Sequence, residues 1–440
     1  MNTLAVDQGT SATKALVVSE DGSVLGTGSS PVNPRAGAGG AVEQDPHELL
    51  DSIIAAGRQA LDEAGVEVEA AGIGNQGETV LCWDPDSGKA LGTALSWQDR
   101  RAAEVTEELA DREDRLVEIT GLPLDPYFAA PKMTWLRRRG NRDGLVSTVD
   151  AWLNYQLTGE AVTDAATASR TLLLDLERAG WSEEACEIFE LDPAKQPRIV
   201  DCDAAIGETD AFGKPLPVTG LAVDQQAALF AESCFATGEA KCTYGTGAFI
   251  LATAGEAALR SRSRLAACVA WQLGGVTTYC LDGQVYTAGA AVSWLERLGL
   301  ISGPAELDSF GEAMPAGGDE VIFVPSLAGL AAPFWAPGAR GGWLGLSLAS
   351  ERADLVRAVV SGIAAQVASL AEAMAADLGR PLERLRVDGG LTRSSSLMQA
   401  QADLLQAPVE VYPSPDATAL GVGAFARMGS GAAATPEDAV

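Results

Sequence analysis

The sequence predicts an α/β protein made of two related domains. Apolar, strand-like segments alternate with helix-like segments along the chain, which is typical of helices packed on a sheet. A chain of 440 residues is also too long for one hydrophobic core and suits two domains. Residues 4–18 and 240–252 each predict strand, Gly-Thr turn and strand, and they lie about half a chain apart. We therefore expect one domain over residues 1–235 and a second over residues 236–440.

The helices are predicted from their caps and from the spacing of apolar residues. Asp45 can cap a helix that begins at Pro46, so we expect a helix over 46–64. A long segment, 354–374, repeats its apolar residues with a helical period and ends before Gly379. Shorter helices are expected over 99–118, 131–140, 149–157 and 394–406, the last after a strand and turn at 385–390. The Ala- and Gly-rich tail after Arg427 is expected to be frayed.

Charge and composition exclude several classes of partner. The formal net charge of −29 opposes binding to nucleic acid and to anionic membranes, because both are negatively charged. No apolar run approaches the ~20 residues that span a bilayer, and the first seven residues lack the charged and apolar regions of a signal peptide. The seven cysteines include no C-x-x-C pair, as expected of reduced thiols in the core. We therefore expect a cytoplasmic protein that acts on small molecules.

A single histidine narrows the catalytic chemistry. Because His47 is the one histidine in the sequence, the composition argues against Ser-His-Asp hydrolysis and multi-histidine zinc sites. His47 itself is expected to be a first-turn residue of the helix over 46–64. A general base must then be a carboxylate, lysine, tyrosine or cysteine. Asp224 follows an apolar strand and precedes an apolar helical run. It is either a helix cap or a carboxylate that deprotonates an alcohol attacking a phosphorus atom.

The Gly-Thr turns indicate phosphate binding. Such turns offer backbone N–H groups and a hydroxyl to phosphate oxygens. Asp7, just before the first turn, is expected to bind Mg²⁺ through water, and Lys14 to meet a phosphate. A third glycine pair, Gly389 and Gly390, also follows a predicted strand. We therefore expect a nucleotide between the two domains, with one phosphate loop from each.

Polar residues interrupt an apolar stretch at 71–83, "AGIGNQGETVLCW". The interruption is either an ordinary turn or the wall of a polar pocket. Aromatic residues elsewhere are usually core residues, but together with nearby carboxylates and amides they suit a hydroxyl-rich ligand. The residues in this combination are Glu78, Trp97, Tyr127, Asp224, Gln225 and Tyr286.

The chain resembles the FGGY carbohydrate kinases, of the actin-like ATPase superfamily, nearly end to end, and within them the glycerol kinases most. The matching stretches, in order, include "AVDQGTSATKALVV", "GNQGETVLCWDPDSGKAL", "SWQDRRAAE", "GLPLDPYFAAPKMTWL", "TDAATASRTLLLDL", "GLAVDQQAALFAE", "TYGTGAFIL" and "RVDGGLTRSSSLMQAQADLL". The resemblance implies two ribonuclease-H-like domains that close on ATP, Mg²⁺ and an acceptor.

The resemblance also implies roles for individual residues. The first phosphate loop would comprise Gln8, Gly9, Thr10, Ser11 and Lys14, with Asp7 on the Mg²⁺ side. The second loop would comprise Gly245, Thr246 and Gly247, and the adenosine would lie beside Gly389, Gly390 and Ser394. The acceptor pocket would be lined by Gln76, Gly77, Glu78, Trp97, Tyr127, Gln225 and Tyr286, with Asp224 as the base.

Four positions depart from the family pattern. Gly77 stands where glycerol kinases carry an arginine that holds a substrate hydroxyl, and such a guanidinium is not replaced neutrally. Ser394 stands in place of asparagine, Lys14 in place of arginine, and Ser361 in place of an acid. Because of the departure at Gly77, the sequence does not determine which acceptor the protein phosphorylates.

The expected function is ATP-dependent phosphorylation of a small polyol or sugar. Glycerol is the first candidate, and erythritol, xylulose or a similar polyol or ketose is the alternative. A non-catalytic sugar or nucleotide sensor would be expected to have lost its base or its phosphate loops, but Asp7, Thr10, Asp224 and Thr246 are all present. The oligomeric state is left open, a homodimer being one alternative.

Overall fold

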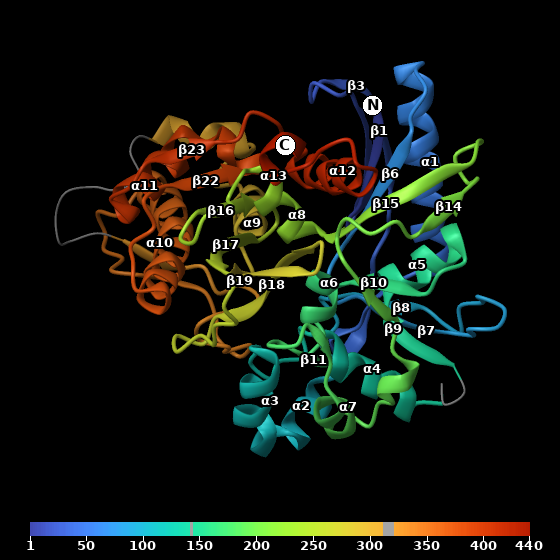
Figure 1. The fold of residues 1–440 in the computed structure, drawn as a ribbon. Coiled ribbons are helices and arrows are strands. Elements are labelled where there is room, and N and C mark those ends of the chain that lie inside the picture. The colour runs from blue at the N-terminus through green and yellow to red at the C-terminus, as the bar shows by residue number, and fades with distance from the viewer. Residues whose placement is uncertain (141–143, 311–320) are drawn as a thin grey trace.

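Two mixed six-stranded sheets organise the residues that the computed structural model describes, namely 1–140, 144–310 and 321–440 (Figure 1). The first sheet has the order β14 (Gly207–Thr209), β15 (Leu216–Val223), β6 (Ala70–Asn75), β1 (Thr3–Gln8), β2 (Ala12–Val18) and β3 (Val24–Pro31). The second has the order β18 (Ala266–Leu273), β19 (Val276–Val285), β17 (Ala248–Gly255), β16 (Ala240–Tyr244), β22 (Leu385–Asp388) and β23 (Val409–Val411). The predicted two-domain α/β class is confirmed.

The two sheets share one strand pattern. In the first, β1 and β2 form an antiparallel hairpin, while β1, β6 and β15 run parallel. In the second, β16 and β17 form the hairpin, while β16, β22 and β23 run parallel. The two Gly-Thr turns therefore occupy equivalent places, as the sequence predicted.

Smaller sheets extend both halves. A five-stranded sheet has the order β4 (Arg35–Ala36), β5 (Val42–Gln44), β8 (Ala94–Leu95), β7 (Val80–Trp83) and β9 (Leu145–Thr148). The two-stranded pairs are β10 (Val162–Asp164) with β13 (Arg198–Val200), β11 (Leu174–Asp175) with β12 (Gly180–Trp181), and β20 (Ile322–Val324) with β21 (Gly342–Leu344). Because β6 leads into β7, the stretch 71–83 links the first main sheet to the five-stranded sheet.

The helices expected over 46–64, 131–140, 149–157, 354–374 and 394–406 are present, with bounds that differ by at most a few residues. The first-half helices are α1 (Pro46–Ala64), α2 (Ala103–Glu108), α3 (Glu113–Thr120), α4 (Ala129–Arg138), α5 (Val149–Thr158), α6 (Ala165–Ser169), α7 (Glu183–Ile188) and α8 (Asp224–Ala231). The second-half helices are α9 (Gly289–Arg297), α10 (Arg352–Leu378), α11 (Ser395–Leu405), α12 (Ala417–Gly429) and α13 (Pro436–Ala439). The Asp45 carboxylate accepts the N–H of His47 at the start of α1, and Gly65 ends it in the left-handed conformation.

Two predictions of secondary structure are wrong. The helix expected over 99–118 is broken into α2 and α3 by a 3₁₀ turn at Ala110–Arg112. No residue between Val105 and Leu116 is fully buried, and in the middle of the segment only the partly buried Leu109 packs against the core cluster. The tail is not frayed either, because α13 packs against α12, and Nη1 and Nη2 of Arg427 lie 3.5 and 3.4 Å from the Ala439 and Asp438 carbonyl oxygens.

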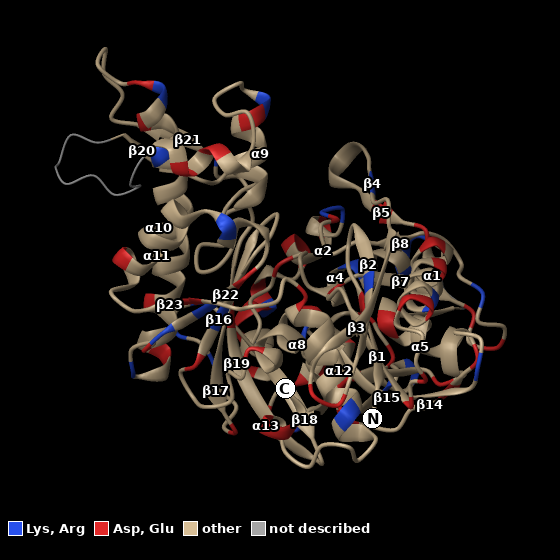
Figure 2. Cartoon of the chain, turned by 90° about the horizontal axis from the view of Figure 1, so that it is seen from above, with Lys and Arg blue, Asp and Glu red and all other residues tan. Residues whose placement is uncertain are grey.

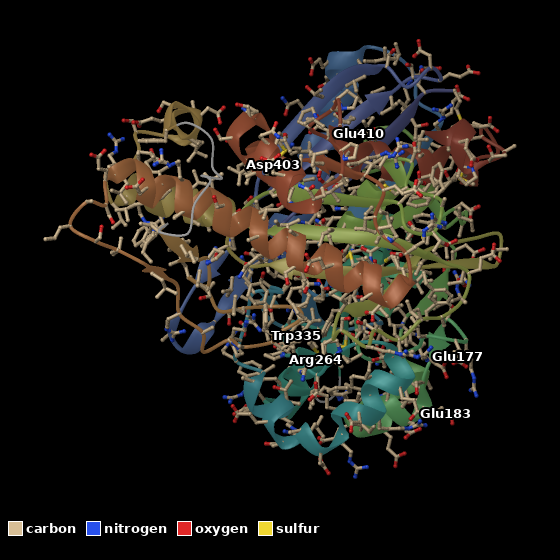
Figure 3. All side chains as sticks on the ribbon, turned by 90° about the vertical axis from the view of Figure 1, so that its left-hand side faces the viewer. Glu177, Glu183, Arg264, Trp335, Asp403 and Glu410 are labelled. Carbon is tan, nitrogen blue, oxygen red and sulfur yellow. The ribbon has the colours of Figure 1, made fainter. Side chains whose placement is uncertain are left out.

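α10 crosses the outer face of the second sheet (Figure 3). Its buried residues include Val359 and Ile363, which belong to the core cluster of that half. By length and composition α10 could cross a membrane, but 61% of its most apolar window is buried inside the protein. On the same side of the molecule, the indole N–H of Trp335 donates to the carbonyl oxygen of Arg264 at 2.8 Å (Figure 3).

α12 comes from the second half of the chain but packs against the first half, next to Asp224, the predicted base. Although α12 comes from the end of the chain, it packs on β1, β6 and β15 of the first sheet and against α8. Figure 2 shows α8 and α12 between the two main sheets. A Cβ atom on Gly421 would lie 1.9 Å from the carbonyl oxygen of Ala227, so this close approach of α12 to α8 requires glycine. The contact holds α8, which begins at Asp224.

Candidate active site

A cavity of about 380 Å³ lies between the two halves, at the turns that follow β1 and β16. Many of the residues predicted for the phosphate loops and the acceptor pocket line it. They are Thr10, Ser11, Gly77, Glu78, Trp97, Tyr127, Asp224, Gln225, Gly245, Thr246, Gly247 and Tyr286. Residues far apart in the sequence therefore meet around one space that is large enough for a small ligand.

The other predicted phosphate-loop and metal residues do not line the cavity but belong to the same hairpin. Asp7 pairs with Lys14 across the β1–β2 hairpin, and the Lys14 ammonium lies 2.8 Å from the Asp416 carboxylate. The buried Gln8 amide donates to the carbonyl oxygen of Gly9 at 2.6 Å. These contacts shape the turn that presents Thr10 and Ser11 to the cavity.

Four further predicted residues also lie outside the cavity lining. Gln76 is buried, and its amide lies 3.3 Å from that of Gln8, so it supports the pocket wall from behind. Gly389 and Gly390 follow β22 beside the second phosphate loop. Ser394 caps α11 and donates its hydroxyl to Asp308 at 2.8 Å.

The carboxylate of Glu78 is held by an arginine that the sequence analysis missed. Nε of Arg170 lies 2.6 Å from the Glu78 carboxylate, and its Nη1 lies 2.6 Å from that of Asp282. All three side chains are buried and line the cavity. Burial raises the pKa of Glu78, and the charge of Arg170 opposes that rise. Arg170 therefore holds two buried carboxylates in fixed positions in the pocket wall.

The backbone of Glu78 is unusual as well. Its φ of 55° lies in the left-handed region, which non-glycine residues rarely adopt. The side chain is nevertheless buried against Arg170 rather than turned to solvent. Such strain concentrates at functional sites, where the surrounding structure holds it in place. The interruption in the stretch 71–83 is thus a strained pocket wall and not an ordinary surface turn.

Asp224 is the first residue of α8 and not its cap. Val223 occupies the capping position, and the Asp224 carboxylate accepts the N–H of Gln225 at 2.8 Å. Burial raises the pKa of Asp224, whereas the Gln225 N–H and the charge of Lys241 lower it. A carboxylate with a raised pKa at the edge of a ligand cavity is suited to accept a proton from an alcohol.

Aromatic side chains close one side of the cavity. The Trp97 ring meets the Tyr127 ring edge-on at 5.8 Å and the Phe249 ring at 6.2 Å. The Trp97 indole N–H also donates to the Thr10 hydroxyl at 2.8 Å, which joins the acceptor wall to the first phosphate loop. These rings can cover the C–H surfaces of a polyol, while the carboxylates bind its hydroxyl groups.

A buried lysine supports the loop that carries Tyr127. The Lys132 ammonium donates to the carbonyl oxygens of Pro126, Tyr127 and Phe128 at 2.9, 2.5 and 2.7 Å. Burial lowers the pKa of Lys132 to about 7, although the neighbouring Glu78 raises it. Three carbonyl acceptors match the three N–H donors of an ammonium, so the charged form is fully hydrogen-bonded there. The loop geometry, and with it the Tyr127 ring, is therefore tied to Lys132.

Carboxylates gather around Asp7, beside the first Gly-Thr turn. Burial and the nearby charge of Asp224 raise the pKa of Asp7 to about 7, with smaller contributions from Asp416 and Asp388 and an opposing one from Lys14. Over the described parts of the chain, no group of three or more His, Cys, Asp or Glu is placed to hold a metal directly. The local excess of negative charge suits a hard cation that keeps its water ligands.

A larger cavity of about 630 Å³ lies apart from this chemistry, between β20 and α10. Its lining is largely apolar and includes Ile322, Phe334 and Ser361. Asp354 and Arg357, which also line it, form an ion pair with each other. None of the residues predicted for catalysis, phosphate binding or acceptor binding lines this cavity, so it is not the candidate active site.

Comparisons with known proteins point to one family over nearly the whole chain. Residues 2–231 match the FGGY family of carbohydrate kinases, N-terminal domain, and residues 240–429 match its C-terminal domain. A glycerol kinase of Alkalilimnicola ehrlichii is 42% identical over 97% of this chain and 90% of its own length.

Solved structures agree in fold. The glycerol kinase of Plasmodium falciparum, determined with ADP, superposes with a TM-score of 0.91 at 30% identity, covering 99% of this chain and 91% of that one. A structure from Brucella ovis described as a xyloylose kinase superposes with a TM-score of 0.90 at 25% identity, covering 99% and 92%. Kinases of different acceptor specificity thus share this architecture, so the fold alone does not select the acceptor.

Proposed function

The chain belongs to the FGGY family of carbohydrate kinases, and from that membership we propose that it transfers the γ-phosphoryl group of ATP to a hydroxyl of a small polyol, glycerol first. One observation carries the proposal. Asp224 lies in a cavity that receives a Gly-Thr loop from each half and is walled by Glu78 and aromatic rings. A base, phosphate-binding turns and hydroxyl-binding groups are the parts that phosphoryl transfer to an alcohol requires.

Each group then has a distinct task. The Asp224 carboxylate takes the proton of the acceptor hydroxyl as its oxygen attacks the γ-phosphorus in line. Glu78 accepts a hydrogen bond from a second hydroxyl, and Gln225 donates one. The backbone N–H groups and hydroxyls of the two turns, at Thr10 and Thr246, bind phosphate oxygens and stabilise the charge that develops there.

We propose that Mg²⁺ would bind beside Asp7. The excess of carboxylates there favours a divalent cation, and hard cations prefer oxygen ligands and water. When bound, Mg²⁺ neutralises negative charge on the transferring phosphoryl oxygens. Lys14, across the hairpin from Asp7, would add a further positive charge at the phosphates. The adenosine would lie beside Gly389, Gly390 and Ser394.

An acceptor panel tests the proposal. Purified protein with ATP and Mg²⁺ is expected to release ADP in step with added glycerol or a four- or five-carbon polyol, measured by a coupled assay. Ketoses and a reaction without acceptor serve as comparisons. ADP release that does not depend on any polyol or sugar would contradict the proposed function.

Gly77 is the position at which acceptor choice can be altered. A Cβ atom there would have one close neighbour, the Val223 Cγ2 at 3.1 Å, so a side chain can enter the cavity if Val223 shifts slightly. Gly77→Arg is expected to lower the KM for glycerol by about tenfold, the value of one charge-assisted hydrogen bond, and to weaken longer acceptors by filling space.

Gly77→Met is the matched control, because it fills similar space without donors. It is expected to weaken longer acceptors without improving glycerol. A Gly77→Arg variant with the acceptor preference of the Gly77→Met variant would show that the guanidinium finds no hydroxyl in this pocket.

Partners and location follow from the same physics. The charge of −29 leads us to propose small-molecule partners, with no nucleic acid or anionic membrane surface. The seven scattered cysteines, with no C-x-x-C pair, lead us to propose a location in the cytoplasm. We also propose a domain boundary near residue 235, with α12 returning to the first sheet. A homodimer stays a proposal to be checked by light scattering.

A further inference from the structure

Lys241 is a fully buried ammonium beside the candidate active site, and the chemistry above does not use it. It lies on β16, four residues before Gly245 of the second phosphate loop. Its Nζ lies 2.6 Å from Oε1 of Gln225 and 2.8 Å from Oγ1 of Thr243. Both of these partners are uncharged. Burying a positive charge against neutral partners is costly, so a lysine here indicates a specific task.

The contact joins the two halves of the chain. Lys241 belongs to the second sheet, whereas Gln225 is the second residue of α8, directly after Asp224. Gln225 and Thr243 both line the cavity. Two carboxylates lie near the ammonium at longer range, since the charge of Lys241 lowers the pKa of Asp224 and of Glu232.

The contact between Lys241 and Gln225 determines which end of the Gln225 amide faces the lysine. An ammonium only donates hydrogen bonds, so the atom of Gln225 that faces it is the oxygen. The amide NH₂ must then point away from Lys241. Glu78 and Asp224 can only accept hydrogen bonds while charged, so the NH₂ group of Gln225 places a donor beside these two acceptors. One hydrogen bond from the Gln225 side chain reaches Asp224 and lowers the pKa of that carboxyl, which leaves the second N–H for a ligand.

We propose that Lys241 is a positioning residue that holds Gln225 with its NH₂ group toward the acceptor and so links the second phosphate loop to the acceptor site. This inference rests on the proposed function. Without Lys241 the amide is free to turn its oxygen toward the acceptor, where it would face a hydroxyl oxygen already surrounded by acceptors. Acceptor affinity, and not nucleotide affinity, is the quantity that Lys241 controls.

A double-mutant cycle tests the inference. Lys241→Met is expected to raise the acceptor KM by about tenfold, with the KM for ATP changed less than twofold. Gln225→Leu is expected to raise the acceptor KM similarly, and Lys241→Met in that background is expected to add less than twofold, because the two residues act as one unit. Multiplicative effects of the two substitutions would overturn the inference.

Conservative variants keep the test decisive if Lys241→Met does not fold. Lys241→Arg retains a donor and is expected to keep the acceptor KM within about threefold of the wild type. Gln225→Glu should raise the acceptor KM while keeping or raising the melting temperature, because its carboxylate pairs with Lys241 but offers no donor. An unchanged acceptor KM in Gln225→Glu would also overturn the inference.

Acceptor-independent ADP release by the wild type would instead refute the proposed function.

Discussion

Replacing Asp224 by Asn is expected to lower kcat for acceptor phosphorylation by roughly 10²–10⁴-fold, while the affinity for ATP stays within twofold. The amide keeps the size of the side chain but cannot take the hydroxyl proton. The ground-state contacts of the phosphate loops at Thr10 and Thr246 are untouched, so nucleotide binding persists. Steady-state kinetics and calorimetric titration with an ATP analogue measure the two quantities separately.

Asp164→Asn is the matched control. Asp164 is also a buried aspartate at a helix N-terminus, where it accepts the N–H of Thr167, but it does not line the cavity. Because asparagine caps helices about as well as aspartate, this variant is expected to keep kcat. Equal losses of kcat in both variants would assign the effect to helix stability and not to a base at Asp224.

Replacing Arg170 by Met is expected to destabilise the protein by about 3–5 kcal/mol and to abolish tight acceptor binding. The substitution leaves the Glu78 and Asp282 carboxylates buried without their shared counter-charge. Without Arg170, the Glu78 carboxylate loses the contact that fixes its position. It is then expected to bind a proton or a water molecule, and its oxygen no longer lies where it can accept a hydrogen bond from the acceptor. Urea unfolding measures the stability loss, and acceptor KM in the folded fraction measures the binding loss.

Two further variants separate charge from geometry. Arg115 also pairs with two carboxylates, Glu118 and Glu184, but on the surface, so Arg115→Met is expected to leave stability and KM unchanged. Arg170→Lys keeps the positive charge, but an ammonium lacks the planar guanidinium that contacts both carboxylates. We therefore expect losses of stability and of acceptor affinity that are smaller than those of Arg170→Met. A full-strength KM effect in Arg115→Met would contradict a specific role for the buried trio.

The local parts of the fold were predictable because their signals are local. The start of α1 follows from Asp45 and Pro46, and the two hairpins follow from Gly-Thr turns between apolar strands. The break between α2 and α3 was not predictable in this way, because it depends on which residues reach the core. The ordered tail was missed for the same reason, since its anchor is Arg427 in a neighbouring helix.

The site was predictable where a residue carries its own chemical signature. Asp224, Glu78 and the Gly-Thr turns stood out by polarity in apolar surroundings, and the cavity contains them. Arg170 gave only a weak signal, a lone arginine in the run "TASRTLLLDL", because its two partners lie far away in the chain. Lys241 was missed because it lies inside an apolar strand, although its partners Gln225 and Thr243 are near in sequence. Buried charges, and the partners that the fold brings to them, are therefore the part that required a structure.

Direct observation of the phosphorylated product tests the central claim. Phosphorus NMR of the wild type with ATP, Mg²⁺ and its best acceptor is expected to show a phosphate monoester of that acceptor growing as ATP declines. The same experiment with Asp224→Asn is expected to show neither change on that timescale. Inorganic phosphate as the only new product, or equal rates for the two proteins, would contradict transfer to an acceptor hydroxyl by an Asp224 base.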